Sequence, residues 1–407
     1  MTVHTWLATA AFGLEAVVAR ELQQLGYDAL SVEDGKVRFQ ADGPAMCRAN
    51  LWLRAADRVL WQLARFPARD FEELFSGIKA IAWEEILPVD AAFPVTAQSV
   101  RSQLHHEPSI QSVSKKAIVE RLKQHYRRFH FQETGVEYPV EVLLHRDEVS
   151  VCLNTTGPGL HKRGYRLRPG AAPLRETTAA ALVLLSYWND SRPFLDPFCG
   201  SGTIVIEAAL WARRLAPGLR RSFLAENWPH IPASWWHQAR QEAHDLKRPR
   251  CEVPLLASDH HPHAIQAVQE NATHAGVASD LIIKQQDALQ ATPPRDYGVL
   301  ITNPPYGERL EDRRAVDQLY TRVTALWSQW PTWSFYVLTS HPRFERIFRR
   351  RADRRRKIYN GRIACTYYQF LGPRPPRSSS SEVAAHDCTP IDLPAMSRRM
   401  TGADGDA

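Results

Sequence analysis

The stretch Phe194-Leu-Asp-Pro-Phe-Cys-Gly-Ser-Gly-Thr-Ile-Val-Ile-Glu-Ala-Ala-Leu210 decides the fold of this chain. It begins as a short apolar strand that ends at Asp196, turns at Gly200 and Gly202, and continues as an amphipathic helix. Glycines in such a turn let a ligand approach the backbone, and the helix N-terminus adds free N–H groups and a partial positive charge. A glycine turn alone identifies no ligand, because strand–glycine–helix segments also occur in proteins that bind nothing.

A second motif, Ile301-Thr-Asn-Pro-Pro-Tyr-Gly-Glu308, follows further along the chain. Its two prolines hold the preceding residues extended, so the Asn303 side-chain oxygen and the Pro304 carbonyl can each accept a hydrogen bond from an aromatic amine. Tyr306 can stack on an extruded base. Such an amine needs positioning and desolvation more than a strong base if it attacks a methyl carried on sulfonium. An isolated Asn-Pro-Pro would be a rigid surface turn, but after a strand and the glycine turn we favour a catalytic role for Asn303, Pro304 and Tyr306.

Composition limits the class of protein. A chain of 407 residues is long enough for two or three domains. It contains no apolar run of about 18 residues and no signal-peptide pattern, so we expect neither a membrane span nor secretion. The six cysteines form no Cys-x-x-Cys pair, which argues against a zinc ribbon and for a reducing cytoplasm. The net charge of +7 favours a polyanionic partner.

The first unit, residues 1–66, has the pattern of a split β-α-β fold. Its expected elements are a strand, a helix closed by Gly26, a hairpin and a second amphipathic helix, at residues 5–10, 14–25, 29–39 and 50–66. This order is compatible with a ferredoxin-like fold.

The second unit, residues 67–166, is a mixed α+β segment with many basic residues. The expected elements are a helix, a strand, a basic helix and two strands, at residues 71–83, 93–97, 109–131, 140–145 and 149–156. Any one basic side chain is best explained as part of a solvated face, but their concentration favours an RNA-facing surface. The basic residues are Arg101, Lys115, Lys116, Arg121, Lys123, Arg127 and Arg128, close to Phe129 and Phe131.

A compact basic and aromatic loop, residues 160–169, ends this unit. It could be a charged linker. We favour an RNA contact for Lys162, Arg163 and Arg166, because the loop lies beside the glycine-turn segment where a phosphate backbone would pass.

The third unit alternates helix and strand, which predicts a doubly wound parallel sheet. Asp259 ends the second strand, where a carboxylate can bind ribose hydroxyls. The spacing from the glycines to Asp259 is longer than usual, so residues 213–250 are an insertion, with Trp228, Trp235 and Trp236 expected to pack it onto the core. The other expected elements are a helix, two strands and an antiparallel pair, at residues 174–188, 281–287, 297–303, 333–339 and 363–371.

Three other segments favour ordinary structural explanations. The histidines of Asp259-His-His-Pro-His263 cannot easily converge on one ion, so we expect a capped turn and no metal. The segment 349–357 is predicted to be a solvated basic loop, with RNA phosphate contact as the alternative. Cys199 has no histidine near it in sequence, so a small packing residue is favoured over a nucleophile. Residues 373–407 are predicted to be a disordered tail.

Taken together, the motifs resemble THUMP-domain class I methyltransferases that act on the exocyclic N2 of guanine in RNA. The likeness is greatest to bacterial 23S rRNA guanine-N2 methyltransferases and covers roughly residues 3–372. It rests on Phe12-Gly-Leu-Glu, Leu160-His-Lys-Arg-Gly-Tyr-Arg, Leu174-Arg-Glu-Thr, the turn and helix of residues 196–207, Asn303-Pro-Pro-Tyr-Gly-Glu, Lys357-Ile-Tyr-Asn-Gly-Arg and Cys365-Thr-Tyr-Tyr-Gln-Phe.

The resemblance implies a Rossmann-like methyltransferase domain over residues 167–372, preceded by ferredoxin-like and THUMP domains that grip RNA. It implies S-adenosylmethionine as methyl donor, held by Asp196, Phe198, Gly200 and Gly202 at its amino acid end. Asp259 would bind the ribose and Asp287 the adenine amine, while Thr177 and Asn303 would line the same pocket. Some relatives carry a second methyltransferase domain, so a chain with one implies one modification.

Three functions follow from these observations. The leading one is guanine-N2 methylation of RNA, most simply 23S rRNA. The second is methylation of another amine, a tRNA guanine or adenine N6, because Asn-Pro-Pro-Tyr serves several amines. The third is a non-catalytic RNA-binding protein, against which the intact acids and glycines argue.

Overall fold

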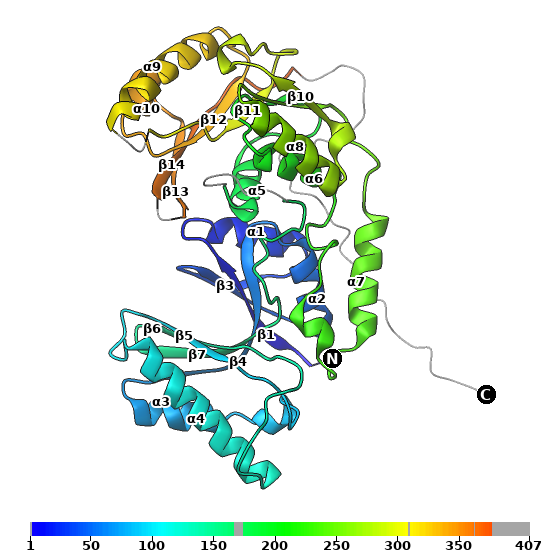
Figure 1. Ribbon diagram of the computed structural model, residues 1–407, viewed down its shortest axis with the longest axis vertical. Coiled ribbons are helices and arrows are strands. Elements are labelled where there is room, and N and C mark those ends of the chain that lie inside the picture. The colour runs from blue at the N-terminus through cyan, green and yellow to red at the C-terminus, as the bar shows by residue number, and fades with distance from the viewer. Residues whose placement is uncertain (1, 167–173, 308–309, 362, 377–407) are drawn as a thin grey trace, which may run out of the picture.

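Two seven-stranded sheets, one above the other, organise the molecule (Figure 1). The computed structural model describes residues 2–166, 174–307, 310–361 and 363–376. The lower sheet contains both N-terminal units, and the upper sheet contains the glycine turn. The predicted α/β class is therefore confirmed, while the tail predicted over residues 373–407 lies almost entirely outside the described residues.

The first unit is a ferredoxin-like fold, as predicted. Its four strands pair antiparallel in the order β2-β3-β1-β4, with two helices packed on them. The elements are β1 (His4–Ala10), α1 (Glu15–Gln24), β2 (Ala29–Glu33), β3 (Lys36–Ala41), α2 (Gly43–Trp52) and β4 (Ala56–Pro67).

The helix predicted over residues 50–66 is wrong. Helix α2 ends at Trp52 and the chain continues as the strand β4. The apolar residues of this segment fit a helical spacing, but pairing with strands on both sides outweighs local preference. A signal for the true helix was present: the Asp42 side chain accepts a hydrogen bond from the Ala45 N–H, with proline in the first turn.

The second unit extends the same sheet. Strand β4 pairs with β7 from Leu60 opposite Asn154 to Pro67 opposite Glu148, which gives the full order β2-β3-β1-β4-β7-β6-β5. We call residues 2–154, which share this sheet, the N-terminal body. The remaining elements are α3 (Phe71–Lys79), η1 (Trp83–Glu85), β5 (Val95–Val100), α4 (Glu107–Tyr126), β6 (Val140–His145) and β7 (Glu148–Asn154).

The upper sheet has the order β10-β9-β8-β11-β12-β14-β13. Its first five strands are parallel, and β14 pairs antiparallel with both β12 and β13, so the predicted antiparallel pair is confirmed. The strands are β8 (Phe194–Asp196), β9 (Leu255–Asp259), β10 (Leu281–Gln285), β11 (Val299–Thr302), β12 (Ser334–Thr339), β13 (Arg354–Asn360) and β14 (Ile363–Phe370).

Helices cover both faces of this sheet. Successive residues of a strand face opposite sides, so Phe194 packs toward α5, α6 and α8 while Leu195 packs toward α9 and α10. The helices are α5 (Glu176–Leu185), α6 (Thr203–Ala212), α8 (Pro262–Ala275), α9 (Leu310–Trp327) and α10 (Phe344–Phe348), with short 3₁₀ turns η2 (Leu224–Asn227), η3 (Ala278–Asp280) and η4 (Ala288–Gln290).

The basic segment 349–357 is not simply a loop, because its second half forms the edge strand β13. Charged side chains are common on edge strands, since they discourage pairing with another chain. Because of its high charge, the segment was predicted to be a solvated loop and the strand was missed.

The insertion 213–250 packs on the N-terminal body, and two of its tryptophans, Trp228 and Trp236, are buried in the core as predicted, with Trp235 packed against it. Its helix α7 (Ala233–Asp245) lies along α2, where Arg48 makes two hydrogen bonds of 2.8 Å to Glu242. The Trp228 ring stacks on Tyr138 with centroids 4.8 Å apart. A Cβ on Gly43 would lie 2.2 Å from the Trp235 ring, so glycine is required for this close approach.

Candidate active site

The glycine turn and the Asn-Pro-Pro-Tyr segment meet at the carboxyl edge of the upper sheet, because β8 and β11 are neighbours. Asp196 is 1% exposed, and its Oδ1 accepts hydrogen bonds from the Thr302 hydroxyl at 2.7 Å and from the Phe198 N–H at 3.2 Å. Thr302 is the last residue of β11 and precedes Asn303 directly. One buried hydrogen bond therefore joins the two motifs that the sequence analysis singled out.

The two glycines of the turn have different roles. Gly200 has a φ of +51°, and a Cβ there would meet nothing within 4 Å. Gly202 has a φ of +80°, and a Cβ there would lie 2.2 Å from Val268 Cγ2 on α8. Gly200 thus faces open space beside the turn, as a ligand cradle requires, whereas Gly202 allows α6 and α8 to pack.

Asp259 supports the turn from the next strand. Its Oδ2 accepts from the Gly200 N–H at 3.1 Å and its Oδ1 from the His261 N–H at 3.0 Å. A carboxylate oxygen has two lone pairs, so both oxygens can still accept from ribose hydroxyls. Asp287 is exposed two residues beyond β10 and caps η4 by accepting from the Leu289 N–H at 2.9 Å. These residues fit the binding of S-adenosylmethionine along the sheet edge.

Burial, helped by the negative charge of Asp259, raises the pKa of Asp196 to about 7, although the hydrogen bonds from Thr302 and Phe198 act to lower it. Its carboxyl group therefore titrates near neutral pH and gains from a cationic partner. Burial, with both carboxylates nearby, also raises the pKa of Cys199 well above its ordinary value. This neutral thiol favours a packing role for Cys199.

The Asn-Pro-Pro-Tyr segment is held from two sides. The Tyr306 hydroxyl donates to Asn303 Oδ1, which ties the last residue of the motif to its first. Tyr320 of α9 is fully buried, donates to the Pro305 carbonyl at 2.8 Å and contacts the Thr339 hydroxyl at 3.0 Å. Sequence reasoning missed Tyr320, because it lies outside the motif and aromatic residues are common on buried helix faces.

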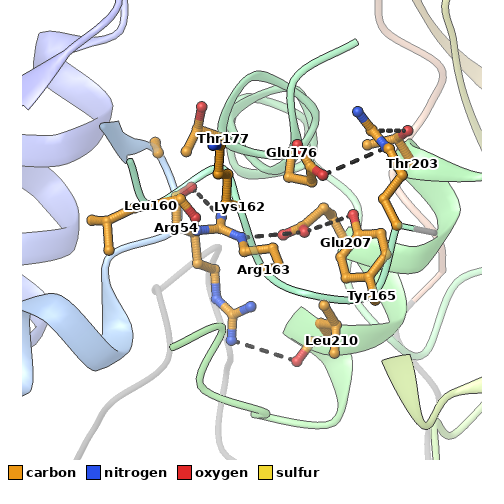
Figure 2. A network of polar contacts seen from close by, with 12 residues as sticks. Arg54, Leu160, Lys162, Arg163, Tyr165, Glu176, Thr177, Thr203, Glu207 and Leu210 are labelled. Atoms are coloured by element: carbon orange, nitrogen blue, oxygen red, sulfur yellow. Dashed lines mark hydrogen bonds and ion pairs between the residues drawn. The ribbon is translucent and has the colours of Figure 1, made fainter. Parts of the chain in front are cut away.

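Within the loop 160–166, Leu160, Arg163 and Tyr165 are buried, and Arg163 and Tyr165 take part in the polar network of Figure 2. Arg163 is 3% exposed and donates to the carbonyls of Leu160 and Arg54. Its Nε lies 3.4 Å from Glu207 Oε1, which also accepts from the Tyr165 hydroxyl at 3.0 Å. The prediction that Arg163 contacts RNA is therefore wrong for this conformation: it joins the N-terminal body to α6.

Two further predicted site residues belong to the same network. Arg166 donates to the Thr203 hydroxyl at 2.8 Å, at the first residue of α6, and lies 3.5 Å from Glu176. The Thr177 hydroxyl donates to Asp57 of β4 at 3.3 Å, so it faces the N-terminal body and not the glycine turn (Figure 2). Only Lys162 of the three predicted RNA-binding residues in this loop is exposed. The basic loop is thus largely an internal connector.

The network extends into the ferredoxin-like fold. The Arg54 guanidinium donates to the Leu215 carbonyl at 2.7 Å, beyond the end of α6. The Glu21 carboxylate accepts from the backbone N–H groups of Arg54 and Ala55 at 2.8 and 3.0 Å. Burial lowers the pKa of Arg54 to about 10, so it stays charged at neutral pH.

The basic residues of the second unit divide into two groups. Lys115, Arg121 and Lys123 form ion pairs with glutamates within the N-terminal body. The rest are exposed and available to a polyanion: Arg101, Lys116, Arg127 and Arg128, beside Phe129, whose side chain is 92% exposed.

Metal-ligand clusters and membrane-spanning helices are both absent from the described part of the chain. Within it, no three His, Cys, Asp or Glu side chains come together as metal ligands would. No helix there is both long and apolar enough to cross a membrane.

Three family profiles match successive parts of the chain. Residues 5–60 match the RlmL ferredoxin-like domain, residues 68–154 the THUMP domain, and residues 163–369 the RMKL-like methyltransferase domain. The matched ranges follow the two halves of the lower sheet and the upper sheet.

Relatives match over nearly their whole length. The candidate RNA methyltransferase YpsC of Bacillus subtilis is 44% identical over 94% of this chain and 100% of its own. A crystal structure described as a predicted N6-adenine-specific DNA methylase from Listeria monocytogenes is 46% identical, with a TM-score of 0.86 over 92% of this chain and 97% of that one. SMU.472, a candidate methyltransferase complexed with SAH, is 42% identical, with a TM-score of 0.87 over 92% and 100%.

The fold and the site define a class I methyltransferase joined to a ferredoxin-like domain and a THUMP domain. The chain belongs to the RMKL-like methyltransferase family. It is an RNA methyltransferase that uses S-adenosylmethionine, so the predicted family, cofactor and RNA partner are confirmed.

Proposed function

We propose that this enzyme transfers the methyl group of S-adenosylmethionine to the exocyclic N2 of a guanine in 23S rRNA. The hydrogen bond between Thr302 and Asp196 carries the proposal, because it fixes the amine-accepting segment next to the turn that holds the donor. A transfer between two bound groups depends on such alignment.

The donor would lie along the carboxyl edge of the upper sheet and supply an electrophilic methyl group. Asp196 attracts its α-ammonium group, while Phe198 and Gly200 border the amino acid end. Asp259 accepts from the ribose hydroxyls and Asp287 from the adenine amine. Gly202 contributes indirectly, because the absence of a Cβ lets α6 pack against α8.

The acceptor amine would be held by Asn303 and Pro304. Two N–H groups donate to Asn303 Oδ1 and the Pro304 carbonyl, which directs the nitrogen lone pair toward the methyl group. Asn303 Oδ1 has a second lone pair, so the hydroxyl of Tyr306 can stay bound while the amine arrives. The Tyr306 ring then stacks on the flipped base.

RNA selection belongs to the N-terminal body and its surroundings. We propose that Lys162 and Arg101, both exposed, contact phosphates, and that the enzyme works in the cytoplasm, where rRNA is made. Guanine and large-subunit rRNA are supported by the motif resemblance described above. Adenine N6 is the second candidate, because the Listeria relative is described as specific for it and the Asn-Pro-Pro-Tyr geometry accepts either amine.

Purified enzyme, labelled S-adenosylmethionine and ribosomal RNA from a strain lacking the gene test this proposal. Nucleoside mass spectrometry should find labelled N2-methylguanosine in 23S rRNA. Asn303→Ala should reduce turnover at least 100-fold, roughly the effect of losing one transition-state hydrogen bond, and leave the dissociation constant for S-adenosylhomocysteine within about twofold. Label found in N6-methyladenosine would show that the target base is adenine and not guanine. Unchanged turnover in Asn303→Ala would refute the proposed role of Asn303 in the mechanism.

A further inference from the structure

Two family motifs far apart in the sequence meet beside the active site. Phe12-Gly-Leu-Glu15 forms the turn between β1 and α1, and Lys357-Ile-Tyr-Asn360 ends the edge strand β13. In Figure 1 the lower ends of β13 and β14 lie close to the loop before α1. The Gly13 carbonyl accepts a hydrogen bond from Arg356 at 3.0 Å, and a Cβ on Gly13 would lie 2.6 Å from the Lys357 carbonyl oxygen.

The fold accounts for three of the four residues in the first motif. Gly13 has a φ of +90° at the tight approach to β13, and Leu14 is fully buried. The Glu15 carboxylate accepts from the N–H groups of Gly13 and Gly35, both at 2.9 Å, so it ties two loops together. Phe12 remains unexplained: its large apolar side chain is 52% exposed.

The exposed Phe12 ring has aromatic and basic neighbours from the other domain. Its centroid lies 6.1 Å from that of Tyr359, with the rings at 70°. The exposed Lys357 places its ammonium group 5.2 Å from the Tyr359 centroid. Aromatic rings next to a cation are suited to single-stranded RNA, whose bases stack and whose phosphates carry charge.

Along β13, the cluster lies one residue away from the contact that Asn360 makes with the Asn-Pro-Pro-Tyr segment. Strand β12 ends at Thr339, which lies opposite Thr366 of β14. The end of the β13–β14 hairpin, where Asn360 lies opposite Ile363, therefore extends beyond the carboxyl end of β12. The Asn360 side chain lies beside the Tyr306 hydroxyl, which donates to Asn303. Tyr359 and Asn360 are successive residues of β13 and face opposite sides of the strand, so the Phe12 cluster and the amine-accepting asparagine lie on the two sides of the same strand end.

We propose that Phe12, Tyr359 and Lys357 form a platform that stacks an unpaired RNA base flanking the methylated nucleotide. The proposal rests on the assignment of RNA as substrate and of Asn303 and Tyr306 as the base-holding residues. Phe12 supplies the stacking ring, Tyr359 holds that ring edge-on, and Lys357 contacts the phosphate of the stacked nucleotide. The ferredoxin-like fold thus contributes directly to the mouth of the active site.

The test separates the aromatic ring from mere apolar volume. Phe12→Leu keeps an apolar side chain and removes the ring, whereas Phe12→Trp keeps a ring. Phe71→Leu, at another exposed phenylalanine on α3, is the matched control. Binding is measured by fluorescence anisotropy with a fluorescein-labelled oligoadenylate, and methyl transfer by KM and kcat for rRNA from a strain lacking the gene.

Phe12→Leu should weaken oligoadenylate binding and raise KM about tenfold, the usual effect of losing one stacked base, with kcat and S-adenosylhomocysteine affinity unchanged. Phe12→Trp and Phe71→Leu should behave like the wild type. Lys357→Gln should reduce the salt dependence of binding by about one phosphate contact.

Wild-type binding and KM in Phe12→Leu would overturn the platform. So would an equal loss in Phe12→Leu and Phe12→Trp that follows a lower unfolding temperature, because Phe12 would then only dock the two domains. If the wild type methylates no guanine, the proposed function fails instead, and the oligoadenylate comparison still decides the platform.

Discussion

Arg163→Ala is the change that best separates an RNA contact from an internal connector. The Arg163 and Glu207 side chains are 2% and 0% exposed, and their ion pair links the loop 160–166 to α6. Removing one partner of a buried pair leaves an uncompensated charge, here on Glu207, and costs about 3–5 kcal/mol. For a domain of this size that loss lowers the unfolding temperature by roughly 6–20 °C.

The assay is thermal unfolding followed by circular dichroism, with RNA binding measured on the same samples below the transition. The adjacent Lys162→Ala is the matched control, because that side chain is exposed. It should leave the unfolding temperature unchanged and reduce the salt dependence of RNA binding by about one phosphate contact. The double variant Arg163→Met with Glu207→Leu should recover most of the lost stability, since it removes both buried charges.

An unfolding temperature within about 1 °C of the wild type, combined with weaker RNA binding, would refute the reasoning for Arg163. Such a result would mean that its side chain leaves the network to contact RNA. Failure of the double variant to recover stability would show that packing around Arg163, and not the buried charge left on Glu207, dominates.

Three further predictions concern the site itself. Gly200→Ala should fold but bind S-adenosylhomocysteine at least tenfold more weakly, because its Cβ enters the open space beside the turn. Gly202→Ala should instead lower the unfolding temperature, because its Cβ clashes with Val268. Calorimetric titration and thermal unfolding distinguish the two variants, and normal affinity in Gly200→Ala would contradict the role of Gly200 as a ligand cradle. Burial raises the pKa of Asp196 to about 7, so its carboxylate becomes protonated as the pH falls through that value. S-adenosylmethionine should therefore bind more weakly below pH 7, and in Asp196→Asn its affinity should no longer depend on pH. Binding titrations across that pH range test both expectations. Tyr320→Phe frees the Pro305 carbonyl and should lower kcat about tenfold with S-adenosylhomocysteine affinity unchanged in steady-state and binding assays; an unchanged kcat would remove Tyr320 from the positioning of the motif.

Much of the fold was accessible from the sequence because its signals are local. The strand, glycine turn and helix of residues 194–212 occur where predicted, as do the hairpin of β2 with β3 and the antiparallel pairing of β12 with β14. The error at residues 50–66 has a non-local cause. Strand β4 is specified by its partners β1 and β7, one of them far along the chain, and no spacing rule within the segment contains that information.

The site shows the same division. Motif residues such as Asp196 and Asn303 lie at the predicted sheet edge, because parallel strands bring their carboxyl ends together. Arg163 could not be placed from sequence, since a basic loop is usually exposed and its partner Glu207 looked like an ordinary helix residue. The support from Tyr320 and the contact of Phe12 with Tyr359 depend on tertiary packing that only the structure shows.

The measurement that tests the central claim most directly is nucleoside mass spectrometry of 23S rRNA and tRNA from cells that lack this protein. Complementation with the wild-type gene and with Asn303→Ala accompanies it. We predict that one N2-methylguanosine disappears from 23S rRNA, returns with the wild type and does not return with Asn303→Ala. An intact set of N2-methylguanosines in 23S rRNA, with a methyl mark lost from tRNA or from adenine instead, would contradict the account.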